Sequence, residues 1–220
     1  MSTAIEFSAA IFDLDGTLLY TLEEIAAATN TVLARAGYPQ HPVDAYRRFV
    51  GDGARTLAFR ALPKEKQNDT DCDSFFPALL EEYDRSLNTI AHPYAGVTKA
   101  LQGFYDAGKQ IAVLSNKPDV LTKNAIKKFF PTISFDIVQG GRPDFPLKPA
   151  PDAALDIAAR LNVSPQQVIF VGDSDVDIKT ACNAGMIPVG AGWGFRGAEE
   201  LLAVGATVVL DVPSDLESLI

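Results

Sequence analysis

The feature that most restricts the fold of this chain is a set of short apolar runs in which polar residues do not alternate with apolar ones. They are AAIF before Asp13, QIAVL before Ser115, FDIVQ before Gly140, QVIFV before Gly172, IPVGA at residues 187–191 and TVVL at residues 207–210. Mostly uninterrupted apolar character indicates strands that are buried on both faces, as in a parallel sheet. The runs therefore predict a parallel sheet with helices on both sides.

Helical patterns lie between these runs. Apolar residues at helical spacing extend from Val97 to Phe104 and from Val120 to Phe129. Strands that alternate with helices predict a doubly wound, Rossmann-like α/β core with right-handed crossovers. The chain has 220 residues, so it has room for such a core and a smaller second module.

The interval from about Tyr20 to Asn88 breaks the alternation, because it holds helical patterns and no convincing strand. One strand precedes this interval and another follows it, which predicts an all-helical cap domain inserted into the core. We expect the core at residues 1–18 and 92–220 and the cap at residues 19–91, with linkers near residues 16–20 and 88–96. The first helical stripe of the cap consists of Leu22, Ile25, Thr29, Val32, Leu33 and Ala36.

Charge and cysteine content exclude several classes of partner. A net charge of -9 argues against nucleic acid, because binding to its phosphate backbone needs clustered Lys and Arg. Cys72 and Cys182 are too few for a disulfide framework, and the N-terminal apolar run stops at Asp13, too early for a signal peptide. No apolar stretch reaches the ~20 residues of a membrane-spanning helix. We therefore expect a cytoplasmic protein, monomeric or homodimeric, that binds neither nucleic acid nor membranes.

Polar clusters follow the predicted strands, and ligands in open α/β sheets bind at that edge. Asp13 and Asp15 leave the same face of an extended segment, so their carboxylates repel each other unless a proton or a cation intervenes. With Asp173 as a third acid, the all-oxygen set suits Mg²⁺ better than zinc. The clusters are DLDGT at residues 13–17, SNK at residues 115–117, Lys148 with Pro149, and GDSDVD at residues 172–177.

A rival pattern lies near the C-terminus. The segment from Gly192 to Gly197 reads GWGFRG, which fits the GxGxxG fingerprint of dinucleotide-binding proteins, and Asp211 follows the next strand. That fold requires at least one more crossover and strand, whereas nine residues follow Asp211. We therefore expect this segment to be a turn near the mouth of the site.

The four polar clusters resemble, in order and spacing, the motifs of the haloacid dehalogenase-like hydrolase superfamily. The resemblance extends from Asp13 to about Arg196 and is closest to phosphoglycolate phosphatase-like members with a helical C1-type cap. It implies that Asp13 is a nucleophile that forms an aspartyl-phosphate, and that Asp15 is the general acid and base. It also implies that Ser115 and Lys148 hold the phosphoryl oxygens.

The same resemblance implies a Mg²⁺ site. Asp13, Asp173 and the main-chain carbonyl of Asp15 would bind the ion, and Asp177 would orient the ion or a water from behind them. An alternative for Asp177 is an acid in the first turn of a helix, where it complements the helix dipole.

Substrate-binding residues are also implied by the resemblance. They are Asn116, Gly16, Thr17 and Arg55, the last in a Gly-rich cap loop at residues 51–55. The Arg55 guanidinium suits a carboxylate or a second phosphate. The alternative for Arg55 is a surface position on an amphipathic helix.

The resemblance thus implies a Mg²⁺-dependent phosphatase that hydrolyses a small phosphate monoester, with phosphoglycolate as the candidate substrate. The carboxylate at Asp15 argues against dehalogenases and phosphonate-cleaving relatives. A sugar-phosphate mutase of the β-phosphoglucomutase type and a pyrophosphatase stay open. The segment between Gly141 and Lys148 is longer than usual, which leaves open how Lys148 is presented and what Arg142 does.

Overall fold

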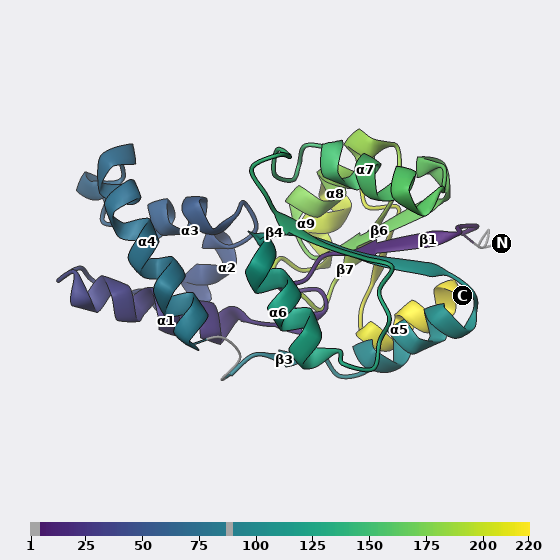
Figure 1. The fold of residues 1–220 in the computed structure, drawn as a ribbon, viewed down its shortest axis with the longest axis horizontal. Coiled ribbons are helices and arrows are strands. Elements are labelled where there is room, and N and C mark those ends of the chain that lie inside the picture. The colour runs from purple at the N-terminus through teal and green to yellow at the C-terminus, as the bar shows by residue number, and fades with distance from the viewer. Residues whose placement is uncertain (1–4, 87–89) are drawn as a thin grey trace.

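The computed structural model describes residues 5–86 and 90–220 (Figure 1). Within these ranges the main sheet has six strands in the order β5-β4-β1-β6-β7-β8, and all neighbouring pairs are parallel. Each apolar run of the sequence forms one of these strands, so the predicted parallel sheet is confirmed. The strands are β1 Ala9–Phe12, β4 Gln110–Pro118, β5 Ile137–Gly141, β6 Val168–Gly172, β7 Ile187–Ala191 and β8 Val208–Leu210.

Helices cover both faces of the sheet, α5 and α6 on one face and α7, α8 and the short α9 on the other (Figure 1). Alternate strand residues enter different clusters: Phe12 packs with Phe104 of α5, whereas Ile11 packs with Ile157 of α7. Burial on both faces explains why the strands lack polar alternation. The helices are α5 Val97–Asp106, α6 Asp119–Phe129, α7 Asp152–Leu161, α8 Asp175–Ala184 and α9 Ala198–Ala203, with 3-10 turns η3 Pro165–Gln167 and η4 Pro213–Leu219.

The strand order places the centre of the sheet at β1. The chain winds outward from β1 to β4 and β5, then returns to β6 on the other side of β1. Ligands bind where the winding direction changes, outside the carboxyl ends of the strands. Strand β4 runs further than predicted and shifts register against β5 between Leu114 and Pro118. Such irregularities redirect side chains, here those of residues 115–117.

Four helices, α1 to α4, lie beyond the carboxyl edge of the sheet (Figure 1) and are called the helical insertion below. Their largest cluster packs the predicted stripe of α1 against residues such as Leu57 and Leu79. Ala36 follows the end of α1 and is exposed, so it does not belong to that stripe. The elements are α1 Leu22–Arg35, η1 Val43–Ala45, α2 Tyr46–Phe49, α3 Ala54–Ala61, η2 Lys64–Lys66 and α4 Asp69–Ser86.

Two short strands connect the insertion to the sheet. Strand β2 (Leu19–Tyr20) pairs antiparallel with β3 (His92–Pro93), so the two predicted linkers lie side by side. Residues 88 and 89 of the second linker fall outside the described residues. The domain boundaries at residues 18/19 and 91/92 stay a prediction. Among the described helices, none is both long enough and apolar enough to cross a membrane.

Candidate active site

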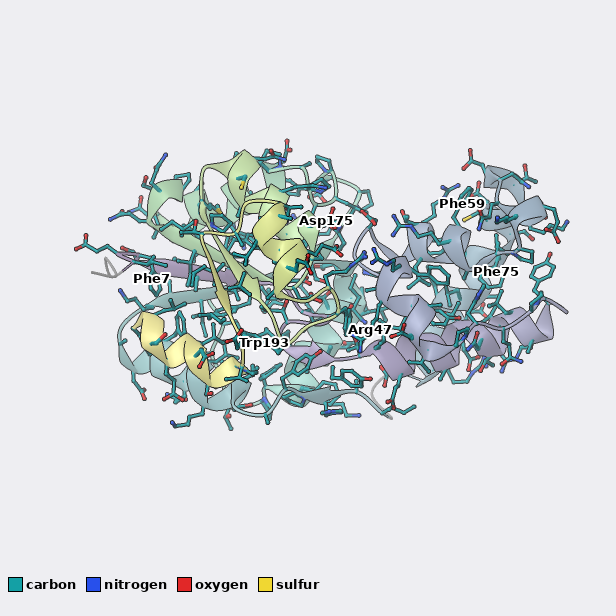
Figure 2. The ribbon with its side chains drawn as sticks, turned by 180° about the vertical axis from the view of Figure 1, so that it is seen from behind. Phe7, Arg47, Phe59, Phe75, Asp175 and Trp193 are labelled. Carbon is teal, nitrogen blue, oxygen red and sulfur yellow. The ribbon has the colours of Figure 1, made fainter. Side chains whose placement is uncertain are left out.

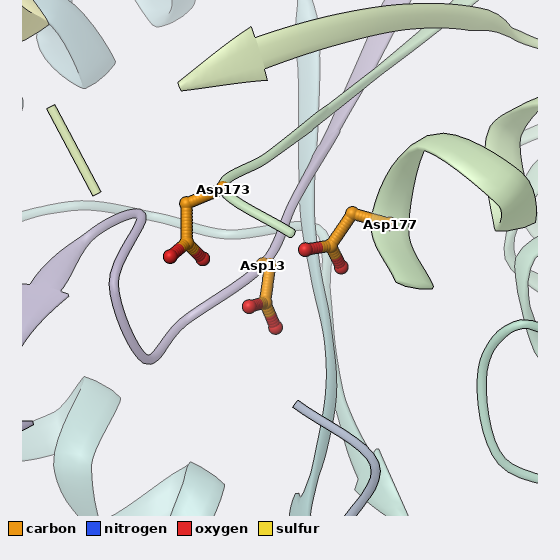
Figure 3. Close-up of side chains that lie close together, drawn as sticks. All are labelled: Asp13, Asp173 and Asp177. Atoms are coloured by element: carbon orange, nitrogen blue, oxygen red, sulfur yellow. The ribbon is translucent and has the colours of Figure 1, made fainter. Parts of the chain in front are cut away.

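Three carboxylates meet at the carboxyl edge of the sheet. Asp13 follows β1, Asp173 follows β6, and Asp177 lies in the first turn of α8. One oxygen of each lies within 4.8 Å of the others, and the three side chains face a common space (Figure 3). The residues are only 8%, 2% and 1% exposed. Buried carboxylates at this spacing require positive charge nearby, because uncompensated buried charge costs several kcal/mol.

Lys148 supplies part of that charge. Its Nζ donates to Asp13 Oδ1 at 2.8 Å and to Asp177 Oδ1 at 2.6 Å, and the residue is 4% exposed. Burial acts to lower the pKa of Lys148, but the charges of Asp13 and Asp177 outweigh it and raise that pKa above its ordinary value. Lys148 therefore stays protonated, but one ammonium cannot compensate three ionised carboxylates.

Burial, and after it the neighbouring charges, shift the pKa values of two of these acids. Burial raises the pKa of Asp13 to about 7; Lys148 opposes the rise and Asp177 adds to it. Burial also raises the pKa of Asp173 well above its ordinary value, with further contributions from the charges of Asp177 and Asp13. A divalent cation would reverse both shifts by favouring the ionised carboxylates.

The start of α8 explains the position of Asp177. Its Oδ2 accepts from the Ser174 amide at 3.1 Å, as in a capping box, and also from the Ser174 hydroxyl at 2.6 Å. Its Oδ1 is left for Lys148, so Asp177 both caps a helix and orients the ammonium. A Cβ on Gly172 would lie 2.2 Å from the Asp177 Cβ, so only glycine there lets α8 approach β6 this closely.

Asp173 is held by two loops that are distant in sequence. Thr17 Oγ1 donates to its Oδ1 at 3.3 Å, and the Phe195 amide donates to its Oδ2 at 2.7 Å. A Cβ on Gly16 would lie 2.3 Å from Asp173 Oδ2, and one on Gly194 would lie 2.1 Å from the Asp173 Cβ. The structure therefore places Gly16 and Thr17 against Asp173, and their predicted contact with substrate stays a prediction.

The contacts of Gly194 and Phe195 with Asp173 were missed by the sequence reasoning. Their signal was the GWGFRG segment, which lies between β7 and α9 beside the acids. Figure 2 shows Trp193 of this segment on the side of the sheet that faces the helical insertion, and its Nε1 donates to the Thr17 carbonyl at 3.0 Å. Arg47 of the insertion donates to the Phe195 carbonyl at 3.3 Å. The segment thus links the acidic cluster to the insertion.

Asn116 explains how the long loop presents Lys148. The Lys148 amide donates to Asn116 Oδ1 at 2.8 Å, and Asn116 Nδ2 donates to the Lys148 carbonyl at 2.9 Å. The same Nδ2 donates to the Gly51 carbonyl at 2.9 Å. The amide predicted to bind substrate is therefore occupied by main-chain partners. Arg142, in the same loop, pairs with Asp144 at 3.1 Å.

A cavity of about 50 Å³ separates the carboxyl edge of the sheet from the helical insertion. Since about 10–15 Å³ holds one water, the cavity has room for a few waters. Within the described residues, the insertion contributes no charged side chain to its lining. The lining from the sheet side includes Asp13, Asp15, Ser115, Asn116, Lys117 and Asp173, and the lining from the insertion consists of Ile25, Val50, Gly51, Gly53, Ala54, Leu57 and Tyr83.

Asp15 faces this cavity paired with Lys117. Both carboxylate oxygens lie 3.2 Å from Lys117 Nζ, which also lies 6.0 Å from the centre of the Tyr83 ring. Lys117 belongs to the polar cluster at the end of β4, and no role was predicted for it from the sequence. Ser115, in the same cluster, is 3% exposed and lines the cavity beside Asp13.

Arg55 is not among the residues that line the cavity. Its Nη2 lies 2.7 Å from Asp73 Oδ1 and 2.9 Å from Asp69 Oδ1, both on α4, and its side chain is 48% exposed. The geometry does not support the predicted contact with substrate, and it agrees with the alternative of a surface arginine on an amphipathic helix. The periodicity of α3 could not show which side of that helix faces the sheet.

The sequence of this chain matches a known family over most of its length. Residues 10–191 match the model of the haloacid dehalogenase-like hydrolases. The chain belongs to this family. The resemblance seen in the four polar clusters is therefore confirmed.

Relatives of this haloacid dehalogenase-like hydrolase include two bacterial proteins named phosphoglycolate phosphatase. The protein of Mannheimia succiniciproducens is 32% identical over 197 residues, which cover 87% of this chain and 88% of the relative. The protein of Xanthomonas campestris pv. campestris is 32% identical over 212 residues, 94% of each. A solved structure from Haemophilus somnus, described as a predicted phosphoglycolate phosphatase, is 26% identical and has a TM-score of 0.89 over 100% of this chain and 99% of that chain.

Proposed function

We propose that this haloacid dehalogenase-like hydrolase is a Mg²⁺-dependent phosphatase that hydrolyses a small phosphate monoester through an aspartyl-phosphate on Asp13. The observation that carries the proposal is the buried Asp13 carboxylate, which lines a small cavity beside Asp173 and bonds Lys148 at 2.8 Å. Relatives at 32% identity are named phosphoglycolate phosphatase, so phosphoglycolate is the first substrate to test.

The acidic cluster fits Mg²⁺. Its donors are carboxylate oxygens within 4.8 Å of one another, and when all three are ionised they carry more negative charge than Lys148 neutralises. Asp13, Asp173 and the main-chain carbonyl of Asp15 would hold the ion. When bound, Mg²⁺ supplies positive charge between an anionic nucleophile and an anionic phosphoryl group.

The residues can carry out both halves of the hydrolysis. A carboxylate oxygen of Asp13 attacks phosphorus, the bond from phosphorus to the ester oxygen breaks, and Asp15 gives its proton to that oxygen. Asp15 then accepts a proton from the water that attacks the aspartyl-phosphate, which releases phosphate and restores Asp13. Lys148 and the Ser115 hydroxyl donate to the phosphoryl oxygens and stabilise the charge that develops there.

The helical insertion acts as a cap in this proposal. Residues 19–91 close over the site and exclude water, while residues 1–18 and 92–220 hold the reacting groups. The insertion lines the cavity with apolar side chains such as Ile25, Leu57 and Tyr83. The mutase alternative stays open.

The proposed location is the cytoplasm. Cys72 and Cys182 are free thiols, which agrees with a reducing compartment. The choice between monomer and homodimer stays a prediction.

Phosphate release from a panel of substrates tests the function. The panel contains phosphoglycolate, ethyl phosphate, pyrophosphate, a hexose phosphate and a nucleotide, each with Mg²⁺ and with EDTA. We expect release from short esters that requires Mg²⁺ and is abolished by Asp13→Asn and by Asp15→Ala. The exposed residue Asp211 lies just after β8, and Asp211→Asn serves as the matched control with full activity. Full activity in EDTA would refute the metal site, and full activity of Asp13→Asn would refute the nucleophile.

A second measurement tests the intermediate. Turnover stopped by acid should leave a phosphoryl group on the peptide that contains Asp13, detected by mass spectrometry. Turnover in oxygen-18 water should put the label in the released phosphate and not in Asp13, because water attacks phosphorus. Label in the Asp13 carboxylate would show attack on carbon instead.

A further inference from the structure

We propose that Lys117 binds a second anionic group of the substrate, one or two bonds beyond the ester oxygen, and thereby selects short phosphate esters that carry a carboxylate. This inference rests on the proposed function and adds a residue that recognises the second anion of the substrate. It starts from the pair between Lys117 Nζ and the two oxygens of Asp15, both at 3.2 Å.

The position of Lys117 follows from the role of Asp15. Asp15 delivers a proton to the ester oxygen, so that oxygen must lie within hydrogen-bond reach of the Asp15 carboxylate. Lys117 Nζ touches the same carboxylate, and its side chain forms part of the cavity lining. The carbon attached to the ester oxygen, and any group on that carbon, therefore come within reach of the ammonium.

The pair with Asp15 cannot persist unchanged during turnover. Both of its contacts are longer than the usual ~2.7–2.9 Å of charged hydrogen bonds, whereas Lys148 makes bonds of 2.8 Å and 2.6 Å. When one Asp15 oxygen turns to the ester oxygen, Lys117 keeps at most one of its two contacts. The Lys117 side chain is only 13% exposed, so water replaces the lost contact poorly. An anionic group on the substrate would replace it.

Other cations are poorly placed for this task. In the described part of the chain, Lys117 and Arg196 are the basic residues that line the cavity, and the helical insertion adds none. Arg196 is already engaged, since its Nη2 donates to the Val50 carbonyl at 3.4 Å and its Nη1 lies 3.8 Å from Glu200. Arg55 is bound to α4 outside the cavity. Lys117 is therefore the cation with the most freedom to meet a substrate anion.

A pair of substrates that differ by one carboxylate tests the proposal. Phosphoglycolate and ethyl phosphate share the ester and the two-carbon chain, and only the first has the second anion. We expect Lys117→Met to lower kcat/KM for phosphoglycolate by about 10- to 100-fold, mainly through KM, and to cause a smaller loss with ethyl phosphate. Lys117→Arg should retain most of the preference for phosphoglycolate.

The outcomes separate this proposal from the phosphatase assignment. Equal losses on both substrates would show that Lys117 acts through Asp15 alone, which overturns the inference and leaves the phosphatase intact. Loss of preference in Arg196→Met, with preference kept in Lys117→Met, overturns it as well. Binding of phosphoglycolate to Asp13→Asn, with and without Lys117→Met, gives a readout that needs no turnover, and unchanged affinity in the double variant would also refute the role of Lys117.

Discussion

Replacing Asp13 by Asn should stabilise the metal-free protein, and the gain should increase with pH. Burial raises the pKa of Asp13 from 3.8 to about 7 in the folded state, against the opposing effect of Lys148. Between these two values the folded state keeps a proton that the unfolded state has released. The wild-type protein therefore loses stability as pH rises through this window, and the uncharged Asn variant does not incur that loss.

The size of the effect follows from the same shift. A difference of about 3 pKa units corresponds to about 4 kcal/mol, reached above about pH 7 and absent below about pH 4. The substitution does not leave the buried Lys148 ammonium without partners. Lys148 keeps its 2.6 Å contact with Asp177, and the Asn oxygen can still accept a hydrogen bond from it. For a chain of this length the gain at about pH 8 is on the order of 10 °C in Tm.

The assay is urea and thermal unfolding in EDTA at intervals from about pH 5 to about pH 8. Asp211→Asn, which removes an exposed carboxylate, is the control and should follow the wild-type curve. Mg²⁺ at about pH 8 should stabilise the wild type more than Asp13→Asn, because the ion binds the ionised carboxylate. If wild type and Asp13→Asn lost stability in parallel over the whole pH range, burial would not be acting on Asp13 and the reasoning would fail.

Three further substitutions test the geometry of the site. Gly194→Ala should raise the Mg²⁺ concentration for half-maximal activity by about 10- to 100-fold, because the added Cβ would displace Asp173. Gly103→Ala on α5 is the control and should leave activity unchanged, because its Cβ would meet only the flexible tip of a side chain. Arg55→Ala should leave KM for phosphoglycolate unchanged, and an increase would restore the predicted contact with substrate. Asn116→Ala should lower kcat by about 100-fold by loosening the loop that carries Lys148, and KM and kcat measured together would reveal a direct substrate contact instead.

The sheet was predictable because burial on both faces leaves a local signal. Each strand is a run of apolar residues that can be recognised from its own sequence, without knowledge of its partners in the sheet, as in QVIFV of β6. Strands β2 and β3 have two residues each, too few to carry a pattern. The extension of β4 was missed because Ser115 and Asn116 are polar, and their place in the strand depends on pairing with β5.

The acids were predictable for a different reason. Both acids directly follow a predicted strand, and the carboxyl ends of parallel strands share one edge of the sheet, so Asp13 and Asp173 were expected at that edge; the pairing of β1 with β6 then brings them together. The supports of Asp173 were not predictable, because Thr17 and Phe195 reach it across 156 and 22 residues of sequence. The pairing of Arg55 with α4 was not predictable, because a helical pattern fixes which residues share a face but not what that face contacts.

The division of charge between the two sides of the cavity has a consequence for specificity. The carboxylates and the basic residues that line the cavity belong to the sheet side, whereas the helical insertion lends apolar walls such as Leu57 and Tyr83. Apolar walls limit substrate size but discriminate weakly between groups of equal size, whereas a desolvated ammonium such as that of Lys117 strongly favours an anion. The insertion should therefore set how long a substrate can be, and the end of β4 should set what charge it must carry. A change of preferred substrate within this family can then arise at the strand end while the insertion keeps its fold.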